Sequence, residues 1–404
     1  MNFLVWRAGQ ARLRARYRKG MRLLHTSDWH VGRSFHGAST LANLEAVLGE
    51  LARIVTAERV DVVVVSGDIF DTGTPSAAAY AVLGNVLRDL HRTGVRIVLT
   101  SGNHDSAQRL GFLAEFTANA GVYVCTDPEA LDVPIELADE YGPVLIYGIP
   151  YLEPALLRYR FPDADLRGQE KTMRFAMERI RADIATRPPA RTVIAAHCFA
   201  SGASGGDGER DITAGGIESV PLDVFDGVDY AALGHIHGRA TLREHVRYSG
   251  APLHYSFSEV NKPRGGWIVD LDGAGLSEVR WVDLPIPRPL AVLRGTLEEI
   301  LADPAREGVR EHWVAAILTD PVRPLDPMRR LQERFPFALT LEHAPETAIV
   351  DTSTSYATRV RERGDGEIIA GFLELVRDGV GPDAEERALI DDLIRAEQRR
   401  ERQE

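Results

Sequence analysis

Five short segments of the sequence end in side chains that can bind metal ions. Each segment begins as an apolar run and then changes to carboxylate, imidazole or amide groups. These groups belong to Asp28, His30, Asp68, Asp71, Asn103, His104, Asp105, His197, His235 and His237. One such cluster is weak evidence, because similar residues occur in many turns. Five clusters predict a metal site, since burying so many ionisable groups without a counter-charge is costly.

The ligand types restrict which ions could bind. The sequence has only two cysteines, Cys125 and Cys198, which cannot build a disulfide framework or a cysteine-based zinc site. Carboxylate, imidazole and amide groups suit Mn²⁺, with Fe²⁺ and Zn²⁺ as alternatives. The candidate ligands are too many for one ion, so we expect two ions about 3.5–4 Å apart that share a carboxylate. Such a pair activates a water for phosphoryl transfer.

The apolar runs, such as VDVVVVS and VRIVLTS, have the composition of strands that are buried on both faces. Residues 40–58, whose apolar positions are spaced three, four and seven apart, predict a helix. Residues 75–94 predict a second helix that is capped by Thr74, opens with Pro75 and ends at Gly94. Alternating strands and helices predict an α/β fold. Such sheets bind ligands beyond the carboxyl ends of their strands, where all five clusters lie.

The remainder of the chain predicts further elements. From about Arg243 the sequence alternates strands and turns, which we expect to form the second half of a β-sandwich in the same domain. A proline-rich stretch marks a boundary near Pro285, and the strands and helices beyond it predict a small α+β domain. The tail from Glu367 predicts helices. Its apolar stripe comprises Ala388, Leu389, Ile390, Leu393 and Ile394. This stripe either binds a partner groove or packs on the neighbouring domain.

The first twenty residues carry six basic side chains and no acidic one. They form either a nucleic-acid-binding arm or a disordered leader that precedes a true start at Met21. The whole chain has a net charge of −12, which becomes −18 without those six charges. This acidity argues against a protein that coats DNA through its overall field, but it allows a nuclease with a local positive surface. No apolar run approaches the roughly 18 residues that cross a bilayer, so we expect no membrane span.

The motifs SDWHVG, GDIFD, GNHD, the lone His197 and GHIH resemble the five motifs of the calcineurin-like metallophosphoesterases in order and spacing. The resemblance covers more than half of the chain and implies a four-layer αββα sandwich. It also implies ligand roles: Asp28, His30 and His237 for one ion, Asn103, His197 and His235 for the other, and Asp68 as the bridge. His104 would contact the substrate phosphate and protonate the leaving oxygen. Asp105 would orient His104.

The residues around these motifs resemble the SbcD family, the nuclease subunits of bacterial SbcCD complexes. The resemblance rests on LLHTSDWHVGRSFHG, VVVVSGDIFDTGTPS, SGNHDSAQRLGF and YSGAPLHYSFSEVN. Serine/threonine protein phosphatases have Asp-Arg-Gly and Asn-His-Glu where this sequence has DTG and NHD. The implied domains are a leader (1–20), a nuclease domain (21–284), a capping domain (285–352) and a C-terminal helical segment that binds the ATPase SbcC (353–404).

The same resemblance implies the activity. We expect a Mn²⁺-dependent exonuclease on double-stranded DNA ends that is also an endonuclease on single strands and hairpins. It would act in DNA repair, recombination and replication, with SbcC and a second copy of the chain as partners. We expect a cytoplasmic location, with nucleoid association when bound to DNA; the residues that contact DNA stay unassigned. One alternative is a small-molecule or nucleotide phosphodiesterase of the same superfamily. Another is a non-catalytic scaffold, against which the complete motif set argues.

Overall fold

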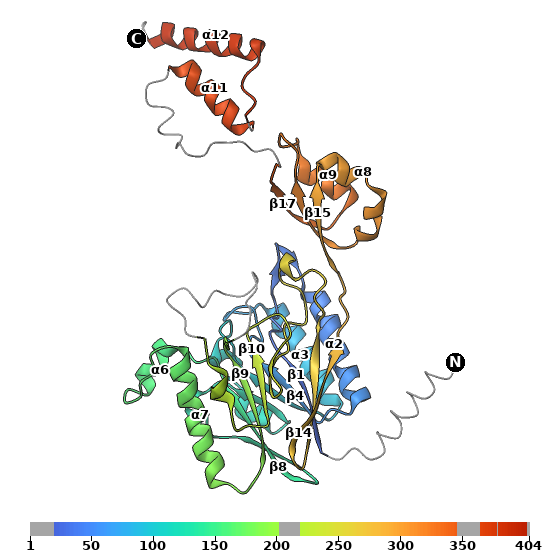
Figure 1. Cartoon of the computed structure of the whole chain (residues 1–404), viewed down its shortest axis with the longest axis vertical. Coiled ribbons are helices and arrows are strands. Elements are labelled where there is room, and N and C mark those ends of the chain that lie inside the picture. Colours follow the sequence, from blue (N-terminus) through green and yellow to red (C-terminus); the bar gives the residue numbers. More distant parts are fainter. Residues whose placement is uncertain (1–19, 202–218, 346–363, 378, 402–404) are drawn as a thin grey trace, which may run out of the picture. The chain divides into compact units, whose positions relative to one another are not determined.

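The computed structural model describes residues 20–201, 219–345, 364–377 and 379–401. The chain divides between Arg288 and Pro289 into two compact units, which Figure 1 shows in the colours of the sequence. Apart from Gly20, the predicted leader lies outside the described residues. So do the last residues of the expected capping domain and the first residues of the expected C-terminal segment.

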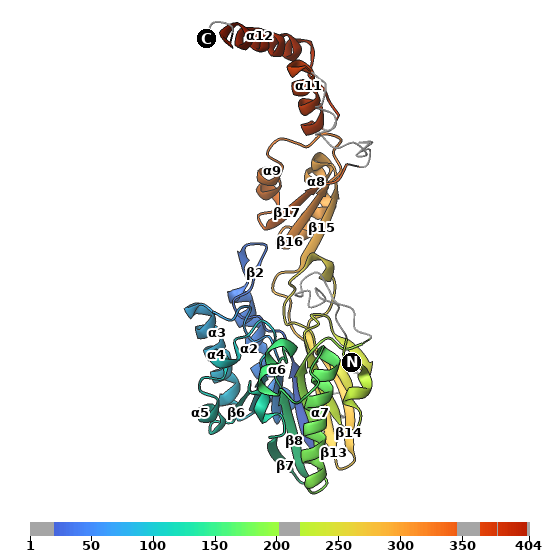
Figure 2. The same cartoon turned by 90° about the vertical axis from the view of Figure 1, so that its left-hand side faces the viewer.

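Two six-stranded sheets form the centre of the first unit (Figure 1 and Figure 2). The first sheet consists, in spatial order, of β14 (Gly275–Asp283), β13 (Gly265–Asp272), β1 (Met21–Thr26), β4 (Val62–Ser66), β5 (Arg96–Thr100) and β6 (Val122–Cys125). The second consists of β11 (Ala240–Arg243), β12 (Val246–Tyr248), β10 (Tyr230–Gly234), β9 (Arg191–His197), β8 (Gly142–Ile149) and β7 (Ile135–Asp139). Strands β1, β4, β5 and β6 are parallel to one another, as are β8, β9, β10 and β12. Within each parallel set the carboxyl ends therefore share one edge.

Helices cover the outer face of each sheet, which gives four layers. The helices are α2 (Leu41–Glu58) and α3 (Ala77–Arg92) over the first sheet, and α6 (Pro154–Arg160) and α7 (Gln169–Thr186) over the second. Along β4, Val64 packs between the two sheets against residues such as Val193, whereas the adjacent Val63 packs under the helices. This alternation explains why the strands are apolar on both faces. The predicted αββα sandwich is confirmed.

The start of α3 differs from the prediction. The helix begins at Ala77 and its N-cap is Ser76, which has an extended backbone. The Ser76 hydroxyl accepts a hydrogen bond from the N–H of Ala79 at 3.2 Å. Thr74 was therefore the wrong cap, and Pro75 precedes the helix instead of opening it, because the hydroxyl that reaches the free N–H groups is that of Ser76.

The strands that follow β10 are shared between both sheets. Strands β11 and β12 extend the second sheet, whereas β13 and β14 join the first sheet beside β1. The pairing of β1 with β13 is antiparallel, with Leu23 opposite Val269. The prediction that this segment forms one half of the sandwich was therefore wrong.

One buried histidine connects the two sheets. The ring of His25 on β1 lies with Nδ1 3.0 Å from the Tyr230 hydroxyl and Nε2 3.1 Å from the carbonyl oxygen of Leu233, both on β10. Burial lowers the pKa of His25 to about 3, so the ring is neutral at physiological pH. A neutral ring satisfies both partners without placing a charge between the layers.

The second unit contains the predicted small domain in which strands and helices alternate, followed by two helices. Its parallel sheet consists of β15 (Leu290–Gly295), β16 (Trp313–Leu318) and β17 (Ala338–His343), with α8 (Leu297–Ala302) and α9 (Pro327–Arg334) packed on it. Thr296 and Glu299 form a capping box that starts α8. The C-terminal helices are α11 (Asp365–Val376) and α12 (Ala384–Glu401). None of the described helices is long and apolar enough to cross a membrane.

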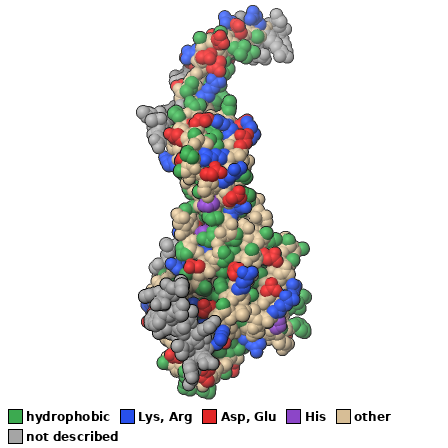
Figure 3. Space-filling model, turned by 90° about the vertical axis from the view of Figure 1, so that its right-hand side faces the viewer, with side chains coloured by type: hydrophobic (Ala, Val, Ile, Leu, Met, Phe, Trp, Pro, Cys, Tyr) green, Lys and Arg blue, Asp and Glu red, His purple; other side chains and the backbone are tan. Residues whose placement is uncertain are grey.

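The predicted apolar stripe of α12 is divided between covered and exposed side chains. Ile394 lies beside Gly366 of α11, whereas Leu389 and Leu393 are each 62% exposed. Helix α11 adds three exposed residues at helical spacing: Ile369, Phe372 and Val376. Each of the two helices therefore keeps an exposed apolar stripe within the described structure. On the face of the molecule drawn in Figure 3, acidic and basic side chains are interspersed.

Candidate metal centre

The seven predicted ligands lie at neighbouring strand ends. Asp28 and His30 follow β1, Asp68 follows β4, Asn103 follows β5, His197 ends β9, and His235 and His237 follow β10. The parallel arrangement of these strands brings the side chains from both sheets to one place. Three overlapping groups of His and Asp side chains there could each hold a metal ion: Asp28 with His30 and His237, Asp28 with Asp68 and His197, and Asp68 with His30 and His104.

The backbone at this place adopts a conformation that is rare for residues other than glycine. Among the described residues, eight that are not glycine have a positive φ, and four of these eight are Asp28, His30, Asp68 and His235. Such conformations cost about 1–3 kcal/mol each and persist only where the surroundings impose them. The N–H groups of Asp28 and His30 donate to the carbonyl oxygens of Gly67 and Asp68, at 3.1 and 2.9 Å. These bonds lock the loops after β1 and β4 together.

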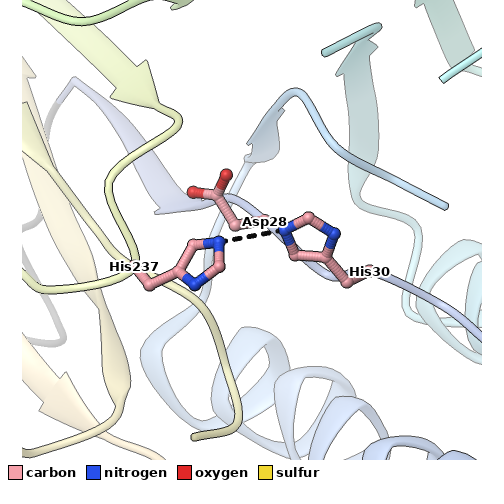
Figure 4. Close-up of side chains that lie close together, drawn as sticks. All are labelled: Asp28, His30 and His237. Carbon is pink, nitrogen blue, oxygen red and sulfur yellow. Dashed lines mark hydrogen bonds between the residues drawn. The ribbon is translucent and has the colours of Figure 1, made fainter. Parts of the chain in front are cut away.

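Asp28, His30 and His237 form what we call the enclosed group, because none is more than 2% exposed. Nε2 of His30 lies 3.0 Å from Nε2 of His237, with Asp28 beside the two rings (Figure 4). Two ligand nitrogens at about 2.1 Å from one ion and 90° apart would also be separated by about 3 Å. Burial raises the pKa of Asp28 to about 8 and lowers the pKa of His237. The spacing fits a shared cation.

Asn103, His197 and His235 form the open group, named for the partly exposed Asn103. Nδ1 of His197 lies 3.0 Å from the carbonyl oxygen of Ser66. A carbonyl only accepts, so Nδ1 carries the proton and Nε2 of the neutral ring is a lone pair. That Nε2 faces the Asn103 side-chain oxygen at 2.9 Å, which is itself 3.3 Å from Nδ1 of His235.

A cation or a proton between Nε2 of His197 and the Asn103 oxygen would stabilise two facing lone pairs. Burial alone would lower the pKa of His197, but the nearby carboxylates of Asp68 and Asp28 raise it to about 9. Protonated His197 is therefore the alternative to a metal ion in the open group. The donor set of imidazole and amide groups fits a divalent ion.

Asp68 lies between the enclosed group and the open group. Its Oδ2 is 3.6 Å from Nε2 of His30 and 3.4 Å from Nε2 of His197. Its Oδ1 accepts the backbone N–H of His104 at 2.9 Å. Burial would raise the pKa of Asp68, but the charge and hydrogen bond of His197 hold it well below the usual range. Gly67 allows this approach, because a Cβ there would lie 2.2 Å from Nδ1 of His197.

His104 is oriented by Asp71 rather than by Asp105. Nδ1 of His104 donates to the carbonyl oxygen of Asp71 at 2.7 Å, which leaves Nε2 as a lone pair 4.0 Å from Asp68 Oδ2. Asp105 instead accepts the backbone N–H groups of Ile69, Phe70 and Gly102 at 2.8–3.0 Å. The predicted role of Asp105 behind His104 was wrong, because its carboxylate joins the second and third motif loops.

Asp71 has a second role that the sequence analysis did not assign. Its Oδ1 lies 3.4 Å from Nδ1 of His30 and 3.7 Å from Arg33. Burial would raise the pKa of Asp71, but His30 and Arg33 lower it, so the carboxylate stays charged. A negative charge at this distance favours a proton on Nδ1 of His30, which leaves Nε2 of the neutral ring facing His237. Its place three residues after Asp68 in GDIFD was the available indication.

Arg264 and Glu259 lie in the segment between β12 and β13 and form a buried ion pair, which we call the Arg264 bracket. This pair supports the enclosed group. The Arg264 guanidinium donates to the carbonyl oxygen of His237 and lies 3.0 Å from the Glu259 carboxylate, and both residues are at most 3% exposed. Glu259 in turn accepts the backbone N–H of Tyr255 at 2.7 Å. The Tyr255 ring packs against the rings of His30 and His237. No motif marks this bracket, because it depends on contacts distant in sequence.

The sequence matches the calcineurin-like phosphoesterase family over residues 21–239, more than half of the chain. The protein therefore belongs to this family, as its motifs predicted. Residues 286–377 match a second family, the type 5 capsule protein repressor C-terminal domain. The second match starts close to the boundary between the two structural units, which lies after Arg288.

The chain is also similar, over nearly its whole length, to a protein described as the SbcD subunit of the nuclease SbcCD. This relative from Staphylococcus epidermidis is 28% identical over 361 residues, which cover 89% of this chain and 94% of the relative. Among solved structures, a dimetal phosphatase from Danio rerio is 13% identical, covering 66% of this chain and all of that one, with a TM-score of 0.38. The calcineurin-like phosphoesterase YfkN from Bacillus subtilis is 14% identical, covering 66% and 90%, with a TM-score of 0.37.

The family and the side-chain clusters define the class of enzyme. The protein is a metal-dependent phosphodiester hydrolase. The predictions of the superfamily, of the resemblance to SbcD and of a divalent metal cofactor are confirmed at this level.

Proposed function

We propose that the protein is a DNA nuclease that works with two Mn²⁺ ions. The observation that carries this proposal is the position of Asp68, whose carboxylate faces the lone pairs of both the enclosed and the open group. The nearly full-length similarity to a nuclease subunit supports DNA as the substrate. Imidazole, carboxylate and amide ligands without thiolate suit Mn²⁺.

The enclosed group would hold one ion, the open group the other, and Asp68 would bridge them. Ions bound there would supply Lewis-acid polarisation of the phosphodiester and of the attacking water. Asp71 holds His104 with a lone pair on Nε2, and the Asp68–His104 backbone bond fixes its distance from the centre. His104 takes up a proton on Nε2 and donates it to the leaving oxygen.

Three segments of the chain have different roles in this proposal. Residues 21–284 cut DNA, residues 285–352 form a cap that orients it, and residues 353–404 bind the ATPase SbcC. The exposed stripes of α11 and α12 support the last assignment, because apolar faces of amphipathic helices dock into partner grooves. Binding through the ATPase also reconciles the net charge of −12 with a DNA substrate.

The protein acts as a homodimer in this proposal. Phe112, Leu113 and Phe116, around the start of helix α5 (Ala114–Ala118), are 79, 50 and 74% exposed. Aromatic side chains are enriched at protein interfaces, so a second copy of the chain is the proposed partner of this surface. Sedimentation of the native protein and of Phe116→Asp tests it: the variant should be monomeric.

The proposed activity is exonucleolytic on double-stranded ends and endonucleolytic on single strands and hairpins. It serves DNA repair, recombination and replication in the cytoplasm, on the nucleoid when DNA is bound. The test is cleavage of an end-labelled duplex and a DNA hairpin with Mn²⁺, with and without SbcC, by the native protein and by His104→Ala. We expect cleavage by the native protein and a loss of about 10²–10⁴-fold in the variant, because a proton donor is removed.

The metal content of the His104→Ala variant distinguishes a proton-donor role of His104 from a ligand role. His104→Ala should keep the Mn²⁺ content of the native protein, because His104 is a proton donor in this mechanism. Loss of metal in the variant would contradict that role. Rapid hydrolysis of cyclic nucleotides without DNA cleavage, even with SbcC, would instead support a small-molecule phosphodiesterase.

A further inference from the structure

A cavity of about 570 Å³ opens beside the open group. Three segments form its walls: residues 101–108, which include Asn103, the loop after β6 that carries Thr126, and α6 with the residues before it. The residues relevant here are Asn103, Gln108, Thr126, Tyr151, Leu156 and Arg160. The volume lies within the range of small-molecule sites, about 300–1,000 Å³, and exceeds what one phosphate needs.

The cavity is continuous with the metal centre. Asn103 lines the cavity and at the same time presents its side-chain oxygen to His197 and His235. Tyr151 lines it too, with its ring 6.3 Å from that of His197 in an edge-to-face arrangement. A group attached to a phosphate at the centre could therefore extend directly into this space.

Tyr151 is held in place from both ends. Its backbone N–H donates to the carbonyl oxygen of Ser101 at 2.7 Å, and its hydroxyl accepts a hydrogen bond from the Gln169 amide at 3.3 Å. These contacts fix the ring before any ligand arrives. A preordered aromatic wall loses little conformational entropy when a flat ligand binds.

The charges of the cavity disfavour a second phosphate. Its lining includes three carboxylates, those of Asp105, Asp127 and Glu153, and one guanidinium, that of Arg160. Arg160 is already engaged, because it lies 3.6 Å from Asp127 and 3.2 Å from Glu129. The balance disfavours an anion and favours an uncharged group.

The remaining wall offers the chemistry that recognises a nucleobase. Tyr151 supplies an aromatic surface and Leu156 an apolar one, while Gln108 and Thr126 carry groups that donate and accept hydrogen bonds. We propose that this cavity binds the nucleobase of a nucleotide that adjoins the scissile phosphate. This site rests on the proposed nuclease function and extends it, because a base enters such a cavity only after it has left the stack of the duplex.

Unpaired nucleotides are accordingly the preferred substrates. Unstacking a paired base costs a few kcal/mol, and the cost is smallest for a base that is mismatched or already single-stranded. Frayed ends and hairpin loops present such bases. The cavity thereby gives one physical reason for a single active site to cut both duplex ends and single strands.

The test compares a nucleotide with a sugar phosphate that has a hydroxyl in place of the base. The protein with Mn²⁺ is titrated with deoxyadenosine 5′-monophosphate and, separately, with deoxyribose 5-phosphate, and both dissociation constants are measured by calorimetry. We expect the base to strengthen binding about tenfold, within the range for stacking one base on an aromatic side chain. Equal dissociation constants in the native protein would overturn the proposal.

Variants assign the effect to the cavity. Tyr151→Ala should reduce the difference between the two ligands to about twofold or less, whereas Tyr151→Phe, which keeps the ring, should preserve it. Tyr159→Ala is the matched control: this α6 tyrosine is 87% exposed and does not line the cavity. Leu156→Asn should also reduce the difference, and its 66% exposure makes the change compatible with folding. A tenfold difference that survives in both Tyr151→Ala and Leu156→Asn would contradict the site.

Cleavage assays keep this proposal separate from the nuclease proposal. DNA cleavage together with equal binding of the two ligands would leave the nuclease and remove the base site. Base-dependent binding without DNA cleavage would leave the base site in an enzyme that acts on a smaller nucleotide. If both proposals hold, DNA with a mismatched terminal base pair should be cleaved faster than fully paired DNA. Tyr151→Ala should reduce this difference in rate.

Discussion

The enclosed and open groups of the metal centre use similar side chains in different surroundings. His30 and His237 are buried beneath Tyr255, and Arg264 supports the backbone of His237 from behind. In the open group, Asn103 forms part of a cavity wall. We infer from this difference that the two groups have separate functions. Packing sets the affinity of the enclosed group for its metal ion, and the open group selects the substrate. The following changes test this division, from the largest expected effect to the smallest.

Replacing Asp68, which lies between the two groups, should remove metal binding by both groups. In Asp68→Ala we expect the loss of both ions and a fall in phosphodiester hydrolysis of more than about 10³-fold, because the carboxylate between the groups is removed. Metal content by mass spectrometry and hydrolysis of a nitrophenyl phosphodiester measure the two effects. Asp165→Ala, which removes an exposed carboxylate of an ion pair, is the control. Full Mn²⁺-dependent activity in Asp68→Ala would refute the shared site.

Replacing one ligand from each group should separate the two halves. His237→Ala and Asn103→Ala should each retain one Mn²⁺ per chain and lose about 10²–10³-fold in rate. Equilibrium dialysis against Mn²⁺ counts the ions. If either substitution emptied both positions, the groups would form a single site and the comparison would fail.

The Arg264 bracket should affect only the enclosed half. Arg264→Met removes the contact with the carbonyl oxygen of His237, and loss of such outer contacts commonly weakens metal binding about 10–100-fold. We expect one of two Mn²⁺ dissociation constants to rise by this factor and the other to stay unchanged. Because Arg264→Met leaves Glu259 buried without its partner, the double variant with Glu259→Gln serves as the control for stability. Equal weakening of both ions would show that the bracket does not distinguish the halves.

The smallest expected effect is on the pH dependence of stability, through His25, which connects the two sheets. The pKa of His25 is about 3 in the folded protein and about 6.5 in an unfolded chain, so the unfolded chain binds more protons between these values. The free energy of unfolding should therefore fall as pH drops below about 6.5, with about 2 kcal/mol lost at pH 5 from this residue. Urea unfolding at pH 8 and pH 5 measures it. His25→Gln should show a smaller pH dependence by that amount; an unchanged dependence would mean that His25 is not the titrating group.

Much of this centre could be predicted because its residues follow strands. Asp28, Asp68 and Asn103 each come just after an apolar run, and parallel strands place such residues at a common edge. The same pattern shows that strands apolar on both faces need cover on both sides, whereas the second sheet of the sandwich was implied by the family resemblance.

What could not be predicted depends on contacts between distant segments. Asp105 was expected behind His104, but the chain path brings the carbonyl oxygen of Asp71 there instead. The Arg264 bracket and the Tyr151 cavity also have no local pattern, because each combines segments from different elements. Strands β13 and β14 were placed in the wrong sheet, since alternation identifies a strand but not its neighbour.

The position of β1 between β4 and β13 has a consequence for how the protein is made. β13 emerges from the ribosome about 240 residues after β1. At about 5–20 residues per second, this delay is on the order of 10–50 s. For most of that time Asp28 and His30 are present in the nascent chain, whereas His237 has not been synthesised. We therefore expect metal loading to follow translation, so that the choice of ion is made by the completed fold.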